Sequence, residues 1–181
     1  YFSYMSLKYT IFIPAYNADK YIDNFCNNIL IQTNKLNQIV IIDDTMNSEF
    51  FFDKIKNKLN SIKSNTCITL IKNSSNLKPP KSWNRNKVFF KNYLIFRMDV
   101  DDIWYPNHAE KMLESYLSDK KSAIYVQKNQ CSFFKKFFYN YKFIFTNQAL
   151  HSSCLFDLQK LDINYPITDF PLDDLYVYIK I

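Results

Sequence analysis

Three aspartates lie within four positions of the chain: Asp99, Asp101 and Asp102 directly follow the apolar run 93–96. Like charges this close repel one another, so they are kept together where a cation or hydrogen-bond donors neutralise them. An extended Asp-x-Asp directs both side chains to one side of the backbone, which suits a hard divalent ion that prefers oxygen ligands. An isolated Asp-x-Asp is more often a solvated acidic loop, so the surrounding elements must decide between the two.

Two further polar clusters follow predicted strands. Pro14, Tyr16 and Asn17 end or follow the buried strand expected at 8–13, and Asp43-Asp44 follows the β-branched run 38–42. Ligands of parallel α/β sheets bind beyond the carboxyl ends of the strands. We therefore expect these two clusters and the Asp99–Asp102 cluster to converge on one crevice.

The hydrophobic pattern alternates between strand-like runs and helical stripes. Strands are expected at 8–13, 38–42, 67–71, 93–98 and 123–127, and helices at 19–31, 48–62, 81–91 and from Asn107 onward. Asn107 is expected to cap the last helix, with Glu110 in a capping box. The β-α-β order predicts a parallel α/β sheet with right-handed crossovers.

Composition indicates a single folded domain. The chain has 181 residues, of which 48% are hydrophobic and 18% aromatic, so disorder is excluded. No apolar stretch reaches the ~18 residues that span a bilayer, and no signal peptide is visible. Because the first residue is Tyr1, we expect a fragment or a trimmed chain.

Cysteine and histidine usage gives no metal-binding pattern. The four cysteines, Cys26, Cys67, Cys131 and Cys154, are widely spread and are interpreted as free thiols in a reducing compartment. His108 and His151 stand apart and are interpreted as packing or surface residues.

The net charge is +6, which is compatible with nucleic acid, a membrane surface or an anionic small molecule as partner. The chain contains no glycine. A Rossmann fingerprint and a Walker loop need glycine where the backbone approaches phosphate, so both are excluded in their usual forms.

The last third of the sequence has a different pattern. Residues 133–143 are aromatic and basic, and a strand pair, an acceptor-site lid and a membrane-facing patch remain open. Packed strands are favoured because aromatics in a small domain usually pack. Asp173 and Asp174 open the apolar run 175–179, where two acids would also suit a helix N-terminus.

In this order the motifs resemble those of the family 2 glycosyltransferases, and the resemblance runs from residue 9 to residue 181. The matching segments are 9–17 (opening strand and Pro-x-Tyr-Asn loop), 29–33 (a Gln-Thr helix ending), 41–44 (Asp-Asp), 82–84 (an Asn), 99–104 (Asp-x-Asp-Asp-Ile-Trp) and 172–175 (an acidic pair). Each motif alone is weak, and their shared order carries the identification.

The resemblance implies a GT-A fold, an α/β architecture with a Rossmann-like, mostly parallel sheet flanked by helices. It implies one domain over 1–181, with a nucleotide-binding half at 8–102 and an acceptor half at 103–181. The family normally continues beyond the late acidic pair, so part of the acceptor side is expected to be missing.

The implied reaction moves a sugar, with inversion, from a nucleotide-diphosphate donor (a UDP-sugar is favoured) to an acceptor hydroxyl. The implied nucleotide-binding residues are Pro14, Tyr16, Asn17, Asp43, Asp44, Asn84 and Asp99. Asp99 and Asp101 would hold Mn²⁺ or Mg²⁺, and Asp102 would hydrogen-bond the following loop. Asp174 would be the catalytic base, supported by Asp173.

The implied partners are the nucleotide-sugar and a glycan or lipid-linked acceptor, with no nucleic acid. A cytoplasmic location is expected, and peripheral contact of 133–143 with the inner face of a membrane stays open as one of the three interpretations of that segment. Asp173 replaces the commoner Glu of the family and keeps its charge.

Several residues depart from the family pattern. Thr45, Asn86 and Asn92 stand where the family usually has Gly, and Asn best tolerates the left-handed backbone that Gly allows. Trp83 stands where Arg is frequent, so Arg85 or Lys81 is expected to supply the diphosphate contact.

Three alternatives compete with this hypothesis. A sugar-phosphate nucleotidyltransferase would carry a Gly-rich loop after its first strand, and Pro-Ala-Tyr-Asn stands there instead. A degenerate, non-catalytic glycosyltransferase-like binding module would fit the missing glycines and the short end. A nucleic-acid-binding protein would rest only on the charge of +6 and the segment 133–143.

Overall fold

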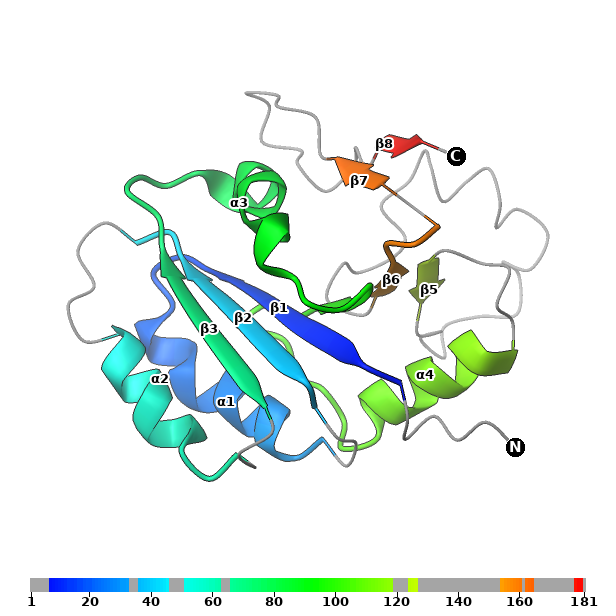
Figure 1. The fold of residues 1–181 in the computed structure, drawn as a ribbon. Helices are drawn as coiled ribbons and strands as arrows, with labels where there is room; N and C mark the ends of the chain where they lie inside the picture. Colours follow the sequence, from blue (N-terminus) through cyan, green and yellow to red (C-terminus); the bar gives the residue numbers. More distant parts are fainter. Residues whose placement is uncertain are drawn as a thin grey trace, which may run out of the picture.

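The computed structural model describes residues 7–32, 36–45, 51–62, 66–118, 124–126, 154–160, 162–164 and 178–180 (Figure 1). The sheet strands are β1 (Tyr9–Ala15), β2 (Gln38–Asp43), β3 (Cys67–Lys72), β4 (Leu94–Arg97), β5 (Ile124–Val126) and β6 (Cys154–Asp157). Strands β7 (Asp162–Asn164) and β8 (Tyr178–Lys180) form a separate pair. The helices are α1 (Ile22–Leu30), α2 (Phe51–Leu59), α3 (Lys78–Asn86) and α4 (His108–Ser118), with 3-10 turns η2 (Asp19–Tyr21) and η3 (Lys87–Phe89).

The main sheet has the strand order β3-β2-β1-β4-β6-β5. The first four strands are parallel, while β6 runs antiparallel to both of its neighbours, β4 and β5. The predicted mostly parallel α/β sheet is therefore confirmed. Strand β6, which separates β5 from β4, was not predicted, because its four residues carry no turn signal or sustained alternation that marks a strand in the sequence.

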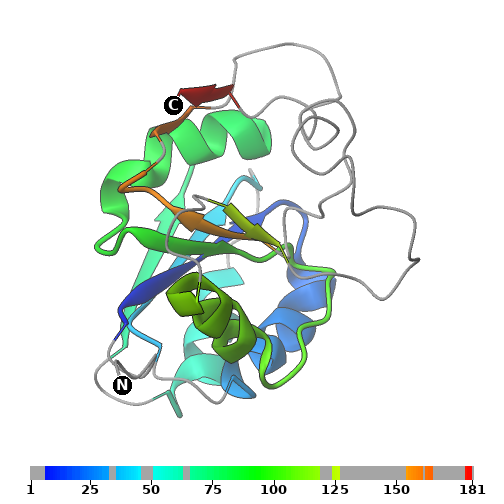
Figure 2. The same ribbon diagram turned by 90° about the vertical axis from the view of Figure 1, so that its right-hand side faces the viewer.

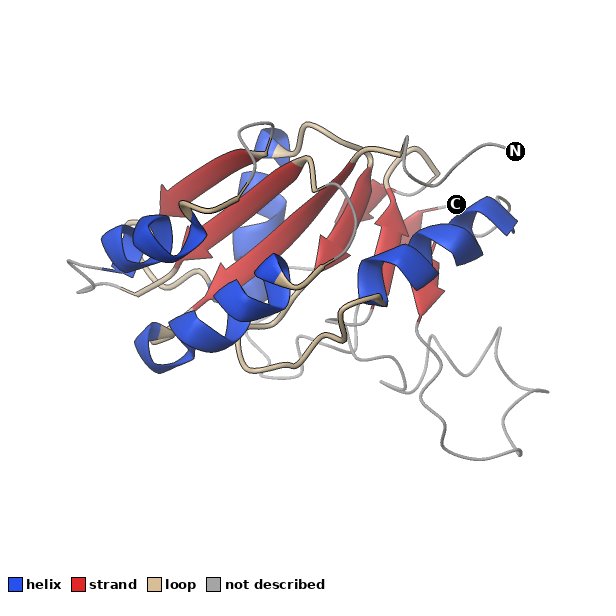
Figure 3. Cartoon of the chain, turned by 90° about the horizontal axis from the view of Figure 1, so that it is seen from below, coloured by secondary structure: helices blue, strands red, loops and turns tan. Residues whose placement is uncertain are grey.

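Helices cover both faces of the sheet, so its central strands are apolar on both sides. Helices α1, α2 and α4 lie on one face and α3 on the other (Figures 1 and 3). Figure 2 shows the sheet between α3 and α4. In β2, Ile39 and Ile41 belong to the core under α1, α2 and α4, whereas Val40 and Ile42 belong to the core under α3. This explains the continuous β-branched run of the sequence.

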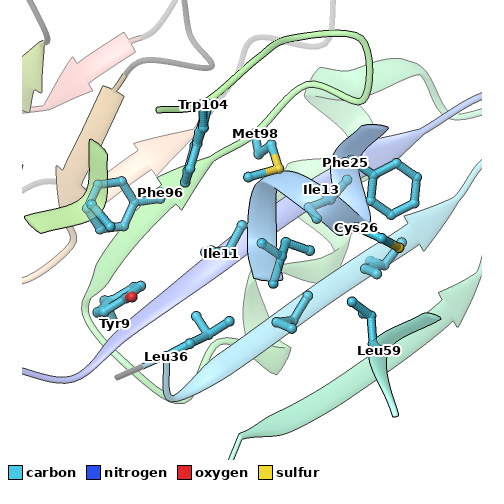
Figure 4. Close-up of a cluster of buried hydrophobic side chains, with 14 of the residues drawn as sticks. Tyr9, Ile11, Ile13, Phe25, Cys26, Leu36, Leu59, Phe96, Met98 and Trp104 are labelled. Carbon is cyan, nitrogen blue, oxygen red and sulfur yellow. The ribbon is translucent and has the colours of Figure 1, made fainter. Parts of the chain in front are cut away.

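The larger core joins the sheet to the loop that follows β4. Figure 4 shows Phe25 and Cys26 of α1 together with Ile11 and Ile13 of β1, all fully buried. The Trp104 side chain enters the same cluster. The site loop is thus anchored in the core by one aromatic side chain.

The helix boundaries differ from the predicted ones in three places, and the first is that the helix expected at 48–62 ends at Leu59. The helix expected at 19–31 begins with the 3-10 turn η2 and becomes α-helical at Ile22. The helix expected at 81–91 begins at Lys78 and ends at Asn86. Prolines in its first turn mark that start, because proline is tolerated where the helix N–H groups have no partner.

Several expectations lie outside the described residues: Asp173, Asp174, Cys131, His151 and the segment 133–143. Within the described part, Cys26, Cys67 and Cys154 are free thiols. His108 is a buried packing residue whose ring lies 4.3 Å from that of Trp104. Among the helices that the structure describes, none has the length and apolar character needed to cross a membrane.

Candidate functional site

Strands β2, β1 and β4 are adjacent and parallel, so their carboxyl ends lie at one edge of the sheet; β1 and β2 are seen side by side in Figure 1. Ala15 at the end of β1 is in register with Asp43 at the end of β2. On the other side of β1, Phe12 is in register with Arg97, and the Met98 N–H continues this ladder by donating to the Phe12 carbonyl over 2.9 Å. The three polar clusters of the sequence therefore follow three adjacent strands.

The loop after β1 presents polar groups to solvent. Tyr16 is 55% exposed, so it is not an ordinary packed tyrosine. Asn17 has a left-handed backbone with φ of 49°, which Asn tolerates better than other non-Gly residues. The Asn17 N–H donates to Thr45 Oγ1 over 2.8 Å, which ties this loop to the one after β2.

Asp43 closes the turn that follows β2. Its Oδ1 accepts the Thr45 N–H over 2.8 Å, an Asx-type turn. Its carbonyl accepts the Asn73 N–H over 3.0 Å. Asp43 is buried, so its side chain stabilises this loop from the core side.

Asp44 is also buried, with 3% of its surface exposed. Its Oδ1 accepts a hydrogen bond from Asn73 Nδ2, and its N–H donates to the Ala15 carbonyl over 2.8 Å. Burial raises the pKa of Asp44; hydrogen bonds from Asn73 and Ser82 act in the opposite direction, and the neighbouring charge of Asp43 adds to the rise. Asp44 thus links the ends of β1, β2 and β3.

The acidic cluster after β4 forms a turn. The Asp102 N–H donates to the Asp99 carbonyl over 3.3 Å, and Asp101 lies exposed within that turn. Asp99 has a buried partner, since Arg97 Nε lies 3.1 Å from Asp99 Oδ1. Two of the three carboxylates are thereby distinguished: Asp99 is neutralised by a guanidinium, and Asp101 faces solvent.

The donor set fits a metal ion that arrives with a diphosphate. Among the residues that the structure describes, no three Asp, Glu, His or Cys side chains gather into a protein-only metal site. Mg²⁺ in nucleotide sites is usually held by one or two carboxylates, substrate phosphates and water. Asp101, with Asp99 two positions earlier, offers that number of carboxylates.

Residues 10–171 match the sequence model of Glycosyl transferase family 2. The chain belongs to glycosyltransferase family 2.

Solved structures show a similar fold. The chain superposes on residues 1–349 of TarS from S. aureus with a TM-score of 0.71 and 18% identity, covering 93% of this chain and 53% of TarS 1–349. For the mannosyltransferase PcManGT from Pyrobaculum calidifontis, solved with GDP-Man and Mn²⁺, the TM-score is 0.70 and the identity 16%, covering 94% of this chain and 51% of that one. The chain thus spans about half the length of these structures. At these identities the likeness establishes the GT-A fold, as predicted. No curated protein sequence matches significantly.

The position where family 2 proteins often carry Arg is a core position in this chain. Trp83 is 1% exposed, and its ring packs edge-on against Phe12 at 5.1 Å and Phe90 at 5.2 Å. Arg85 is exposed and Lys81 is partly exposed on the same helix. These two cations therefore remain the predicted diphosphate contacts. Asn84 lies between them and is partly exposed.

The missing family glycines are accommodated in different ways. Asn86 has φ of −103°, so it is not left-handed, and its Nδ2 donates to the Ser82 carbonyl over 2.8 Å. Asn92 donates to Thr10 Oγ1 over 3.0 Å. Among the described residues the positive φ values belong to Asn17 and Lys78. The expectation that Asn replaces Gly in a left-handed backbone was therefore wrong for both Asn86 and Asn92.

Arg97 is the site residue that sequence reasoning missed. It ends the otherwise apolar strand Leu94–Arg97, and its guanidinium is buried beside Asp99. A charge at the end of a buried strand was the available signal, since buried charges are normally paired. The Asp102 carbonyl accepts hydrogen bonds from Asn24 and Asn28 of α1, and a bond from Asp102 to the following loop stays a prediction.

Proposed function

We propose that the chain transfers a sugar from a nucleotide-diphosphate donor to an acceptor hydroxyl, with a divalent metal and with inversion. The observation that carries this is the meeting of three polar strand ends at one sheet edge in a family 2 domain, with Tyr16 and Asp101 exposed there.

The nucleotide is proposed to bind across the ends of β1 and β2. Exposed Tyr16 and Asn17 make the outward contacts, with Pro14 beside them, and the Tyr16 ring stacks on or borders the base. The buried pair Asp43-Asp44 holds these loops and adds negative charge beneath the ribose and base donors. Asn84 on α3 completes the proposed nucleotide-binding set.

The diphosphate is proposed to lie over the turn after β4. Asp101 is the proposed ligand of Mn²⁺ or Mg²⁺, and Asp99, oriented by Arg97, contacts the ribose or a water on the metal. When bound, the metal supplies Lewis-acid neutralisation of the charge that develops on the departing diphosphate. We favour a UDP-sugar, since TarS has been solved with UDP-GlcNAc. The GDP-Man complex of PcManGT makes GDP the second probe.

The proposed chemistry is a single displacement. The acceptor oxygen attacks the anomeric carbon while the bond from that carbon to the diphosphate oxygen breaks, and the bonding electrons leave with the diphosphate. Asp174, supported by Asp173, takes the acceptor proton, a contribution of typically ~10²–10⁴-fold in rate. Attack opposite the leaving group inverts the configuration.

We propose different functions for the two halves of the chain. Residues 8–102 bind the nucleotide, and residues 103–181 face the acceptor, a glycan or lipid-linked hydroxyl. Contact of 133–143 with the inner face of a membrane, from the cytoplasm, is part of this proposal.

The test is calorimetry of the full chain with UDP and with GDP, each with and without Mn²⁺, followed by assays of donor hydrolysis. Metal-dependent binding of one nucleotide and slow hydrolysis of its sugar conjugates are expected. Binding without hydrolysis or transfer to any acceptor would favour the non-catalytic binding module. Binding of neither nucleotide would refute the proposal.

A further inference from the structure

Three amide side chains line one face of α1 and the residues just after it. Asn24, Asn28 and Gln32 are spaced four positions apart, which places them one above another on a helix surface. We call them the amide ladder. They contact the segment 100–109, which contains the acidic turn after β4 and the start of α4.

The first two amides bind the main chain of the acidic turn. Asn24 Nδ2 donates to the carbonyls of Val100 over 3.0 Å and Asp102 over 2.9 Å. Asn28 Nδ2 donates to the same Asp102 carbonyl over 2.6 Å, and Asn28 Oδ1 accepts the Trp104 N–H over 3.2 Å. Asn28 therefore bridges both sides of residue 103 with one planar amide.

The third amide extends the ladder to α4. Gln32 Nε2 donates to the Tyr105 carbonyl over 3.1 Å and to the Asn28 carbonyl over 3.0 Å. Its Oε1 accepts the Ala109 N–H over 3.2 Å, in the first turn of α4. The ladder thus runs from the acidic turn to the next helix.

Two side chains of the segment 100–105, those of Val100 and Trp104, pack against the larger core. Ile103 is 76% exposed and Tyr105 is 67% exposed, whereas Trp104 is buried against Phe96, with ring centroids 5.8 Å apart. Two such side-chain anchors fix points on the loop but not the peptide planes between and around them. The ladder fixes those planes, because its bonds go to main-chain atoms.

We propose that the amide ladder presets the turn after β4 so that Asp101 is held in position for a metal-bound nucleoside diphosphate. This rests on the proposed function. Asn24, Asn28 and Gln32 are positioning residues, since they bind the loop and not the ligand. A loop ordered in advance does not have to be ordered when the ligand binds, so affinity is gained without new contacts.

The first test measures the loop without any ligand. In Asn28→Ala, the Trp104 amide loses its acceptor, and its hydrogen exchange is expected to accelerate about 10-fold, the loss of roughly one hydrogen bond. The matched control is Asn27→Ala, an exposed Asn one position earlier on the same helix. In Asn27→Ala, the Trp104 amide is expected to exchange at the native rate.

The second test measures nucleotide binding by calorimetry with UDP, or with GDP if only GDP binds the native chain. Asn28→Ala is expected to bind the nucleotide about 10-fold more weakly in the presence of Mn²⁺, from a similar loss of preorganisation. Without Mn²⁺ its affinity is expected to equal that of the native chain. If Asn28 had a purely structural role, Asn28→Ala would lower the melting temperature but leave the ratio of the nucleotide affinities with and without Mn²⁺ unchanged.

The outcomes separate the two proposals. If the native chain binds neither nucleotide with Mn²⁺, the proposed function fails and the ladder's ligand role fails with it. If the native chain binds but Asn28→Ala shows native exchange at Trp104 and a native metal dependence, the ladder proposal alone is overturned. Should Asn28→Ala not fold, Asn24→Ala, from a partly exposed position, replaces it in the calorimetry with the same criterion and a smaller expected loss.

Discussion

At the scale of single residues, Asp44 shows how a site carboxylate can cost stability. Burial holds its pKa above the ordinary aspartate value of 3.8. The native state therefore binds this proton more tightly than the unfolded chain does. This contribution to stability is fully present below the unfolded pKa and is lost as pH rises through the native pKa.

Asp44→Asn is accordingly expected to become more stable relative to the native chain as pH rises from about 4 to about 7. The amide keeps an oxygen that can accept from Asn73 and has no charge to bury. Urea unfolding across this range measures the trend, with the exposed Asp53→Asn of α2 as matched control. A stability difference that stays constant or reverses would contradict the assignment.

The residue scale also shows the limits of the sequence. Asp99, Asp101 and the pair Asp43-Asp44 were predicted to lie at one edge of the sheet because each follows a strand. The order of strands and polar residues along the chain was sufficient for that prediction. The hydrogen bond that the Trp104 N–H donates to Asn28 Oδ1 joins residues 76 positions apart, and no local pattern encodes it. Such contacts depend on how α1 packs beside the loop, which only the fold determines.

At the scale of elements, Trp83 packs α3 against the sheet. Trp83 touches Phe12 of β1 and Phe156 of β6. Trp83→Ala is expected to lower the free energy of unfolding by about 3–5 kcal/mol, the usual cost of truncating a buried aromatic. Denaturant unfolding measures this, and Val88→Ala, at a position 77% exposed, is the control. Equal stability of the two variants would show that Trp83 does not anchor α3.

The difference between local patterns and tertiary pairing explains which elements were predictable from the sequence. The β-branched run of β2 and the apolar stripe of α4 are local patterns, and both elements were found. Strand β6 pairs with β4 and β5, far from it in the chain, and has only four residues. Its place in the sheet is a tertiary property, so periodicity could not reveal it.

At the scale of the whole molecule, the fold brings the loops after β1 and β2 and the acidic turn after β4 to one edge of the sheet. The family assignment supports the proposal that the nucleotide-sugar binds there. Arg97 neutralises Asp99 and leaves Asp101 as the exposed carboxylate. The central claim is therefore that Asp101 couples metal binding to nucleotide binding.

The most direct measurement of that claim is calorimetry of UDP, or of GDP if only GDP binds, to the native chain and to Asp101→Asn, with and without Mn²⁺. The native chain is predicted to bind more tightly with Mn²⁺, and Asp101→Asn is predicted to lose most of that gain while its metal-free affinity and melting temperature stay near native. An equal gain from Mn²⁺ in both proteins would contradict the account.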